Sequence, residues 1–254
     1  MTITITTTSV AFILLSFGLV SCGVWLFKSF QKDGGVREYG RVGYLLSLLL
    51  LGFGFKNGIM GFGALFFAKN SEMLYFVLIA SHLFLGIITL LGVYTIYNIF
   101  SHRIASYLGM VLAGILGIGL VATTIATHPR PFITPQNGIE WNMNFPLSLL
   151  VFCLLFISIG SILYIFIRVF FVTETRSVKI FSFSLSVLAL AGIVLVFMQL
   201  ILPHSDVITV GTQIFDFGIM VGSILFIIVL LIVPIINNII QNRKEKAFNL
   251  SKKL

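Results

Sequence analysis

The stretch Leu46 to Phe67, LSLLLLGFGFKNGIMGFGALFF, decides the fold class of this chain. It is long and apolar enough to cross the hydrocarbon core of a membrane, which takes about 20 helical residues. Lys56 and Asn57 stand near its midpoint. Because an ionisable side chain at that depth is costly, it usually faces the interior of a helix bundle or a watery cavity. The sequence therefore predicts that other helices surround this one.

The composition of the whole chain is that of a membrane protein. Of its 254 residues, 58% are hydrophobic and 9% are charged. Charged residues make up about 25% of an ordinary soluble domain. The apolar runs are continuous rather than alternating, which excludes a membrane β-barrel. We predict an all-α, polytopic membrane protein.

Seven apolar runs predict a bundle of seven transmembrane helices over residues 1–240. The expected spans are 10–30, 43–67, 74–100, 105–127, 146–171, 180–202 and 209–236. The first run lacks the positively charged start and the cleavage site of a signal peptide, so we expect it to remain as a helix. Residues 241–254 form a short basic tail, which is too small to be a separate output domain.

The distribution of basic residues predicts the orientation of the spans. With the N-terminus outside, thirteen of the 16 lysines and arginines fall on the cytoplasmic side, whereas Lys69 and Arg130 fall outside and Lys56 lies within the membrane. Cytoplasmic segments of membrane proteins are enriched in Lys and Arg. We therefore predict an N-out, C-in protein of the plasma or inner membrane, with the lipid bilayer as its first partner. The net charge of +8 needs no nucleic acid to explain it.

Small residues spaced four apart predict close contacts between helices. They are Gly54 and Gly58 in the second span, Gly109, Ala113 and Gly117 in the fourth, and Gly218 and Gly222 in the seventh.

Polar residues inside three spans fall on single helix faces. The longest such stripe, in the seventh span, comprises Thr209, Thr212, Gln213, Asp216 and Ser223. On an otherwise apolar helix, a polar stripe faces inward. The third span has a face made of His82, Gly86 and Thr89, and the fourth has one made of Gly117, Thr124 and His128.

Lys56, His82 and Asp216 are expected at a similar depth. His82 and Asp216 lie about 10 to 12 Å inside the predicted outer ends of their spans, at 1.5 Å per residue. Lys56 lies deeper, but its long side chain can extend outward. Two interpretations stay open: a buried Lys56–Asp216 ion pair that fixes the helix register, or a ligand or proton site that also uses His82 and Gln213. His82 can also be an interior histidine that is simply hydrogen-bonded.

The loop 128–145, HPRPFITPQNGIEWNMNF, is a second candidate site. Its prolines and its Asn137-Gly138 pair favour turns and an extended path. Glu140 and Trp141 follow, and a tryptophan suits the membrane interface. We predict a lid that folds over the outer end of the bundle. The alternative is an exposed connector with one aromatic anchor.

A metal site and enzymatic activity are the weaker alternatives. His128, His204 and Asp206, together with Glu140, offer ligands suited to zinc or copper, but no metal-binding motif contains them. No nucleophile stands at a catalytic spacing from a base, so we expect neither an enzyme nor a cofactor. The seventh span has no lysine for a retinal, as microbial rhodopsins have, and the third ends in YNIFSHR rather than in the DRY-type triplet of G-protein-coupled receptors.

These patterns lead to one functional hypothesis and two alternatives. The hypothesis is a receptor-like or sensor-like protein whose outward-opening polar pocket binds a small ligand. Its ligand-binding residues would be Lys56, His82, Gln213, Asp216, Glu140 and Trp141. Because the tail is short, a signal would pass to a cytoplasmic or membrane protein partner. The alternatives are a small-solute or proton-coupled transporter and a structural subunit of a larger membrane complex.

Overall fold

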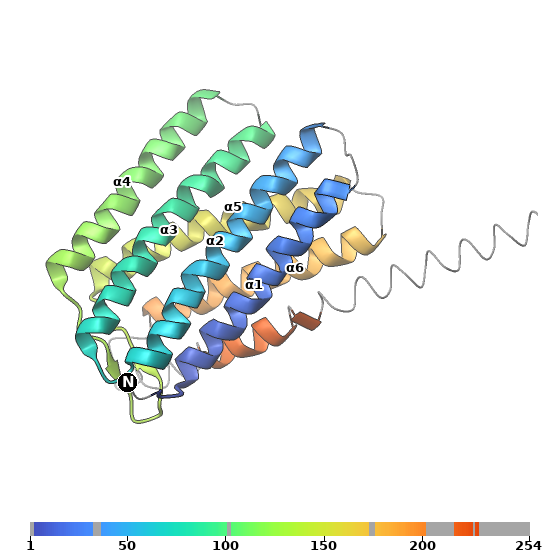
Figure 1. The fold of residues 1–254 in the computed structure, drawn as a ribbon. Coiled ribbons are helices and arrows are strands. Elements are labelled where there is room, and N and C mark those ends of the chain that lie inside the picture. Colours follow the sequence, from blue (N-terminus) through green and yellow to red (C-terminus); the bar gives the residue numbers. More distant parts are fainter. Residues whose placement is uncertain are drawn as a thin grey trace, which may run out of the picture.

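The chain folds into a bundle of long helices, described here from a computed structural model. The structure describes residues 3–32, 37–100, 103–172, 176–201, 216–225 and 227–228. Its labelled helices are α1 (Thr7–Lys32), α2 (Arg37–Phe67), α3 (Ser71–Phe100), α4 (Arg103–Thr127), α5 (Phe145–Val172) and α6 (Arg176–Ile201). A further helical segment, Asp216–Leu225, follows (Figure 1).

Five helices are long and apolar enough to cross a membrane. Their apolar segments, which lie within α1 to α5, are Thr7–Lys28, Gly43–Phe67, Ser71–Ile96, Tyr107–Thr127 and Phe145–Arg168. The first five predicted spans coincide with them, which indicates an integral, multi-pass membrane protein. The sixth predicted span falls on α6, whose shorter apolar segment is Ser182–Val194. Most of the seventh predicted span and the whole basic tail lie outside the described residues.

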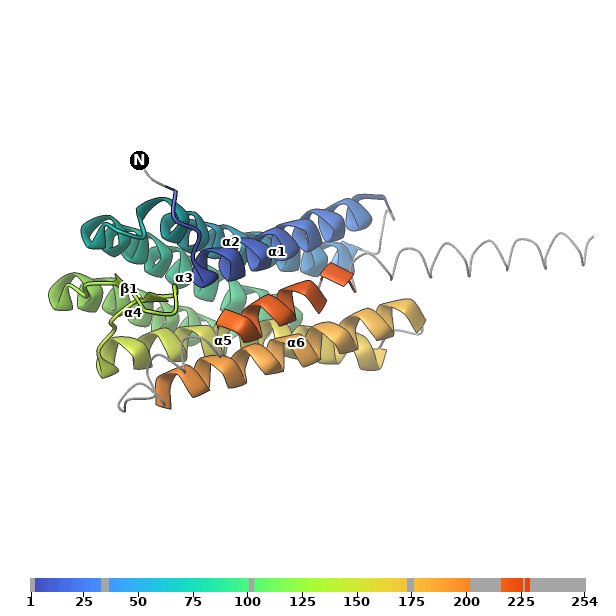
Figure 2. The ribbon, with the colours of Figure 1, turned by 90° about the horizontal axis from the view of Figure 1, so that it is seen from below.

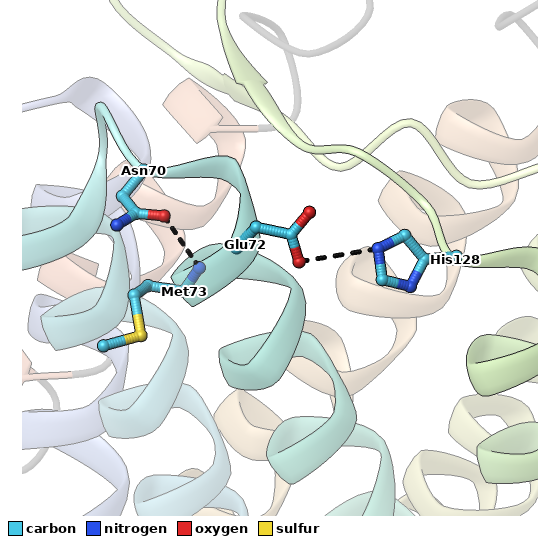
Figure 3. A network of polar contacts seen from close by, with 4 residues as sticks. All are labelled: Asn70, Glu72, Met73 and His128. Atoms are coloured by element: carbon cyan, nitrogen blue, oxygen red, sulfur yellow. Dashed lines mark hydrogen bonds and ion pairs between the residues drawn. The ribbon is translucent and has the colours of Figure 1, made fainter.

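Side-chain caps fix where three of the helices begin. At α1, the Thr6 hydroxyl accepts from the Ser9 amide and the Ser9 hydroxyl accepts from the Thr6 amide, both at 3.0 Å. Asn70 Oδ1 accepts from the Met73 amide at the start of α3 (Figure 3). Asn144 Oδ1 accepts from the Leu147 amide at the start of α5. Each cap satisfies an amide that the first helical turn leaves without a partner.

The helices form two packed groups. In the first, α1 packs on α2, α2 on α3, and α3 on α4. In the second, α5 packs on α6, and α5 also contacts α3 and α4. Figure 2 shows the Asp216–Leu225 segment between α1 and α6. The N-terminus and the 128–145 loop lie at the same end of the bundle (Figure 1), which we call the hairpin end.

Glycines bring two pairs of helices into close contact, as predicted for the second and fourth spans. A Cβ added to Gly54 would lie 2.5 Å from Val20 Cγ2, so α1 and α2 meet at this glycine. A Cβ added to Gly117 would lie 3.1 Å from the Cα of Gly86, so α3 and α4 touch backbone to backbone. Gly218 and Gly222 instead line a cavity.

The helix α4 has its apolar side chains on the outside of the bundle. Only 22% of its apolar segment is buried, and Val111, Ile115 and Ile118 are all more than half exposed. A soluble domain rarely exposes an apolar surface of this extent. The exposed side of α4 therefore fits contact with lipid.

The 128–145 loop folds into a small hairpin against the bundle. Its strands β1 (Phe132–Ile133) and β2 (Ile139–Glu140) pair antiparallel, with Phe132 opposite Glu140. Ile139 and Trp141 are buried against a cluster made of Phe12, Met60, Ala64, Ala68, Leu74 and Leu78. The prediction that this loop is ordered against the end of the bundle is confirmed. The described chain is mostly helical, as predicted, and the hairpin adds a short strand pair to it.

Candidate functional site

A cavity of about 300 Å³ lies between the two groups of helices. Each surrounding element contributes residues spaced so that they share one side of a helix. The main contributions are Phe12, Leu15 and Leu19 of α1; Leu50, Phe53, Lys56, Asn57 and Met60 of α2; Leu78, Ser81, His82 and Leu85 of α3; Ser148, Val151, Leu155, Ile159, Ile162 and Phe166 of α5; Leu185, Ala189, Ala191 and Gly192 of α6; and Gly218, Ile219, Gly222 and Ser223 of the Asp216–Leu225 segment. Glu140, Trp141 and Met143 close the hairpin end.

Lys56 lies in the wall of this cavity with no charged partner among the described residues. Its side chain is 8% exposed. Its ammonium nitrogen lies 3.5 Å from Asn57 Oδ1, which is the limit of a hydrogen bond, and 5.6 Å from the centre of the Phe12 ring. Asn57 is held in place because its amide donates to the Phe53 carbonyl at 2.8 Å. A buried ammonium group with such weak contacts leaves most of its donor capacity unused.

Ser81 adds a second polar group that its own helix does not satisfy. Buried serines and threonines elsewhere in the bundle, such as Ser47, Thr89 and Ser158, donate to the carbonyl four residues earlier. The Ser81 hydroxyl is buried and has no hydrogen-bond partner in the described part of the chain. An unsatisfied buried hydroxyl costs about 1–3 kcal/mol. Ser81 lines the cavity but its oxygen is enclosed, so an occupant of the cavity can satisfy it only after the hydroxyl turns toward the cavity.

His82 presents a hydrogen-bond acceptor to the same cavity. Its Nδ1 lies 2.8 Å from Thr124 Oγ1. The Thr124 hydroxyl already donates to the Leu120 carbonyl at 2.7 Å, so it accepts from His82. This assigns the proton to Nδ1 and leaves Nε2 with a lone pair in the neutral ring. No described residue bonds to Nε2, and the ring lines the cavity. His82 is therefore hydrogen-bonded inside the bundle through Nδ1 and can also serve the site through Nε2, so the two interpretations do not exclude each other.

Of the two interpretations left open, the ion pair between Lys56 and Asp216 is not found in the described structure. Asp216 Oδ2 instead accepts hydrogen bonds from the hydroxyls of Thr8 at 2.6 Å and Thr7 at 3.1 Å, and its side chain is 2% exposed. The Thr8 hydroxyl also accepts from the Ile139 amide at 2.8 Å. Asp216 thus joins the start of α1 and the hairpin to the Asp216–Leu225 segment. A similar depth did not mean that Lys56 and Asp216 face each other.

The structure brings together four of the six predicted ligand-binding residues. Lys56, His82, Glu140 and Trp141 all line the cavity. Asp216 is buried beside it in the contacts with Thr7 and Thr8, and Gln213 lies outside the described residues. The inward direction of the polar stripe is confirmed at Asp216 and Ser223, which are both buried.

His128, the first of the weakly predicted metal ligands, lies away from this cavity. Its Nε2 is 3.5 Å from Glu72 Oε2 at the start of α3 (Figure 3), and its ring centre is 4.0 Å from that of Tyr75. His204 and Asp206 lie outside the described residues. Within the described ranges, no three His, Cys, Asp or Glu side chains are grouped as a metal site would require.

Several polar residues of the site were not singled out from the sequence. Ser81 stands next to His82, but a serine in a helix usually bonds to its own backbone and attracts no attention. Ser148 also lines the cavity, as does Asn57, which was noted in the sequence beside Lys56 but not assigned to the site. The partners of Asp216 had one visible signal, the run of threonines from Thr6 to Thr8 at the start of an apolar helix.

Comparisons with known proteins add no family to this description. No protein-family model, characterised protein or solved structure matches the chain.

Proposed function

We propose that this chain is a receptor-like, seven-helix membrane protein that binds a small ligand in the cavity between its two groups of helices. The observation that carries the proposal is the convergence of Lys56, Ser81 and the Nε2 of His82 on one cavity, each with unused hydrogen-bonding capacity. Ligand pockets typically have about 300–1,000 Å³, apolar walls and a few polar groups that orient the ligand. This cavity of about 300 Å³ has that character.

The hairpin supplies the cover that such a pocket needs. Ile139 and Trp141 are buried, and the hairpin is bonded to the start of α1 through Thr7 and Asn137. In the proposed orientation the hairpin end faces outside, so the hairpin separates the cavity from the external solution. A signal would reach a protein partner through displacement of the helices that the ligand contacts.

The walls favour a receptor over a transporter. The charged residues of the cavity, Lys56 and Glu140, come from its hairpin end and its middle. The far part is lined by apolar residues such as Ile162, Phe166 and Leu185. A polar solute crossing the membrane would meet no polar group there to replace its hydration. A binding site that does not continue into a path fits a receptor.

The test is a thermal-shift screen of the purified protein in detergent. The panel contains amino acids, short-chain carboxylates, long-chain fatty acids, sterols and quinones. Gly192→Leu fills the cavity at a lining residue whose added Cβ meets nothing within 4 Å, and Gly119→Leu on α4 is the matched control outside the cavity. We expect at least one class to raise the Tm of the wild type and of Gly119→Leu but not of Gly192→Leu.

Two results would contradict the proposal. The first is a panel in which no compound gives a shift that depends on Gly192. The second is accumulation of the bound compound inside proteoliposomes, which would establish the transporter alternative.

A further inference from the structure

The cavity is polar at one level and apolar beyond it. Lys56 and Ser81 lie at the same depth on neighbouring antiparallel helices, since each is about 16 Å along its helix from the hairpin end at 1.5 Å per residue. Away from the hairpin end, the wall of α5 is apolar from Leu155 to Phe166, which is about 16 Å of helix. A small polar ligand would leave this part empty.

The part of the cavity at the level of Lys56 and Ser81 favours a ligand group with a negative charge. Lys56 is buried, and no described residue supplies the counter-charge that buried ammonium groups normally have. Turned toward the cavity, the Ser81 hydroxyl, which is enclosed and has no partner among the described residues, offers one further donor. The other charged lining residue, Glu140, has Oε1 at 3.4 Å from the Asn142 amide, within the hairpin. A carboxylate that accepts from Lys56 and Ser81 would satisfy both groups.

One residue that lines the cavity is exposed midway along a helix. Ala191 lines the cavity and is exposed, and it lies near the middle of α6. The surface around the middle of an apolar helix faces the hydrocarbon core of a membrane. A ligand that is itself a bilayer component can therefore reach the cavity from the side.

From these three observations, we infer that the ligand is a single-chain amphiphile with a carboxylate head, held by Lys56 and Ser81, and with an apolar tail that lies along α5 toward Phe166. This inference rests on the proposed function and assigns its ligand class. A long-chain fatty acid is the simplest molecule of this class.

The experiment compares four probes that differ in head or tail. They are palmitate, hexadecanol, butyrate and hexadecyltrimethylammonium, each titrated into the protein in nanodiscs. Trp141 lines the cavity, and the only other tryptophan is Trp25. In a Trp25→Phe background, the fluorescence of Trp141 therefore reports binding. We expect palmitate to bind about tenfold or more tightly than each of the other probes, which corresponds to about 1.4 kcal/mol.

Substitutions at Lys56 then test the role of the charge. Lys56→Met should weaken the binding of palmitate by about tenfold and change the affinity for hexadecanol by no more than about twofold. Lys56→Arg should retain much of the preference for palmitate over hexadecanol. Lys69→Met, a lysine in the turn after α2 that does not line the cavity, should change nothing. Ser81→Ala is the second variant if Lys56→Met does not fold, and it should weaken palmitate by about threefold or more.

The outcomes separate this inference from the proposed function. Equal binding of palmitate and hexadecanol, tighter binding of the cationic probe, or equal effects of Lys56→Met and Lys69→Met would each overturn the carboxylate assignment. Tight binding of butyrate would overturn the role of the tail. In all these cases, binding that Gly192→Leu abolishes would leave the proposed function standing. If no probe or panel compound shows binding that depends on Gly192, both are overturned.

Discussion

Lys56 is a single residue whose charge the described protein does not balance. Replacing it with methionine keeps an unbranched side chain of similar length and removes the buried ammonium group. Because an unpaired buried charge is costly, Lys56→Met should stabilise the ligand-free protein by about 1 kcal/mol or more. Thermal unfolding of delipidated protein in detergent measures this, with Lys69→Met as the exposed control. A loss of about 3–5 kcal/mol would instead reveal an ionic partner for Lys56.

Asp216 has the opposite role, since its carboxylate is the acceptor for two threonine hydroxyls. Asp216→Ala should destabilise the protein by about 1–3 kcal/mol, because Thr8 and Thr7 lose their acceptor. Asp216→Asn keeps an oxygen at that position and should cost less. Denaturant unfolding of both variants measures the difference. Combined with Lys56→Met, the Asp216→Ala effect should be additive within about 0.5 kcal/mol, and strong coupling would mean that the two residues meet after all.

At the scale of whole elements, the contact between α3 and α4 depends on two facing glycines. A Cβ on Gly86 would lie 3.3 Å from the Cα of Gly117, so the helices must separate to accept it. Gly86→Ala should therefore destabilise the bundle by about 1–3 kcal/mol. Gly119→Ala, whose Cβ meets nothing within 4 Å, should be neutral or slightly stabilising because alanine favours helix. Equal unfolding midpoints for the two variants would contradict this packing.

The hairpin is a second element whose bonding can be measured. The amides of Thr134 and Gly138 are bonded within the hairpin, and that of Ile139 donates to the Thr8 hydroxyl. Hydrogen exchange at these amides should be far slower than in a free peptide. Thr8→Val removes the acceptor for Ile139 and the donor to Asp216, so it should accelerate exchange at Ile139. If these amides exchanged as fast in the wild type as in a free peptide, the hairpin would not be packed against the bundle.

The elements were predictable because each depends on its own local sequence. The run 43–67 ends with α2 at Phe67, and the run 146–171 lies within one residue of both ends of α5, since the length of an apolar run follows the thickness of a membrane. The hairpin strands were not predicted, although its turn was, because two-residue strands leave no periodic pattern. The close contacts at Gly54 and Gly117 followed from small-residue spacing.

The partners of the site residues were beyond prediction from one sequence. Counting residues along a helix gives depth, which is why Lys56 and His82 were correctly expected in one region. Depth does not give the angle at which a helix faces its neighbours. Asp216 turned toward Thr8, a residue at the start of α1, whereas Lys56 turned toward the cavity. That choice depends on packing between elements that are far apart in the chain.

At the scale of the whole molecule, the proposed orientation places the hairpin end outside. Thirteen of the 16 basic residues then lie on the cytoplasmic side. Gln136→Cys, at an exposed hairpin position, should react with a membrane-impermeant maleimide in intact cells. Gly35→Cys should react only after the membrane is permeabilised. Both are made with Cys22 and Cys153 replaced by serine. The reverse pattern of labelling would overturn the orientation.

The bond between Thr8 and Asp216 joins residues that are 208 positions apart. At a synthesis rate of about 5–20 residues per second, α1 enters the membrane about 10 to 40 s before its carboxylate partner is made. During that interval the side of the cavity that the Asp216–Leu225 segment lines is incomplete. The Asp216–Leu225 segment is therefore made after the other described helices, and the side of the cavity that it lines is completed last.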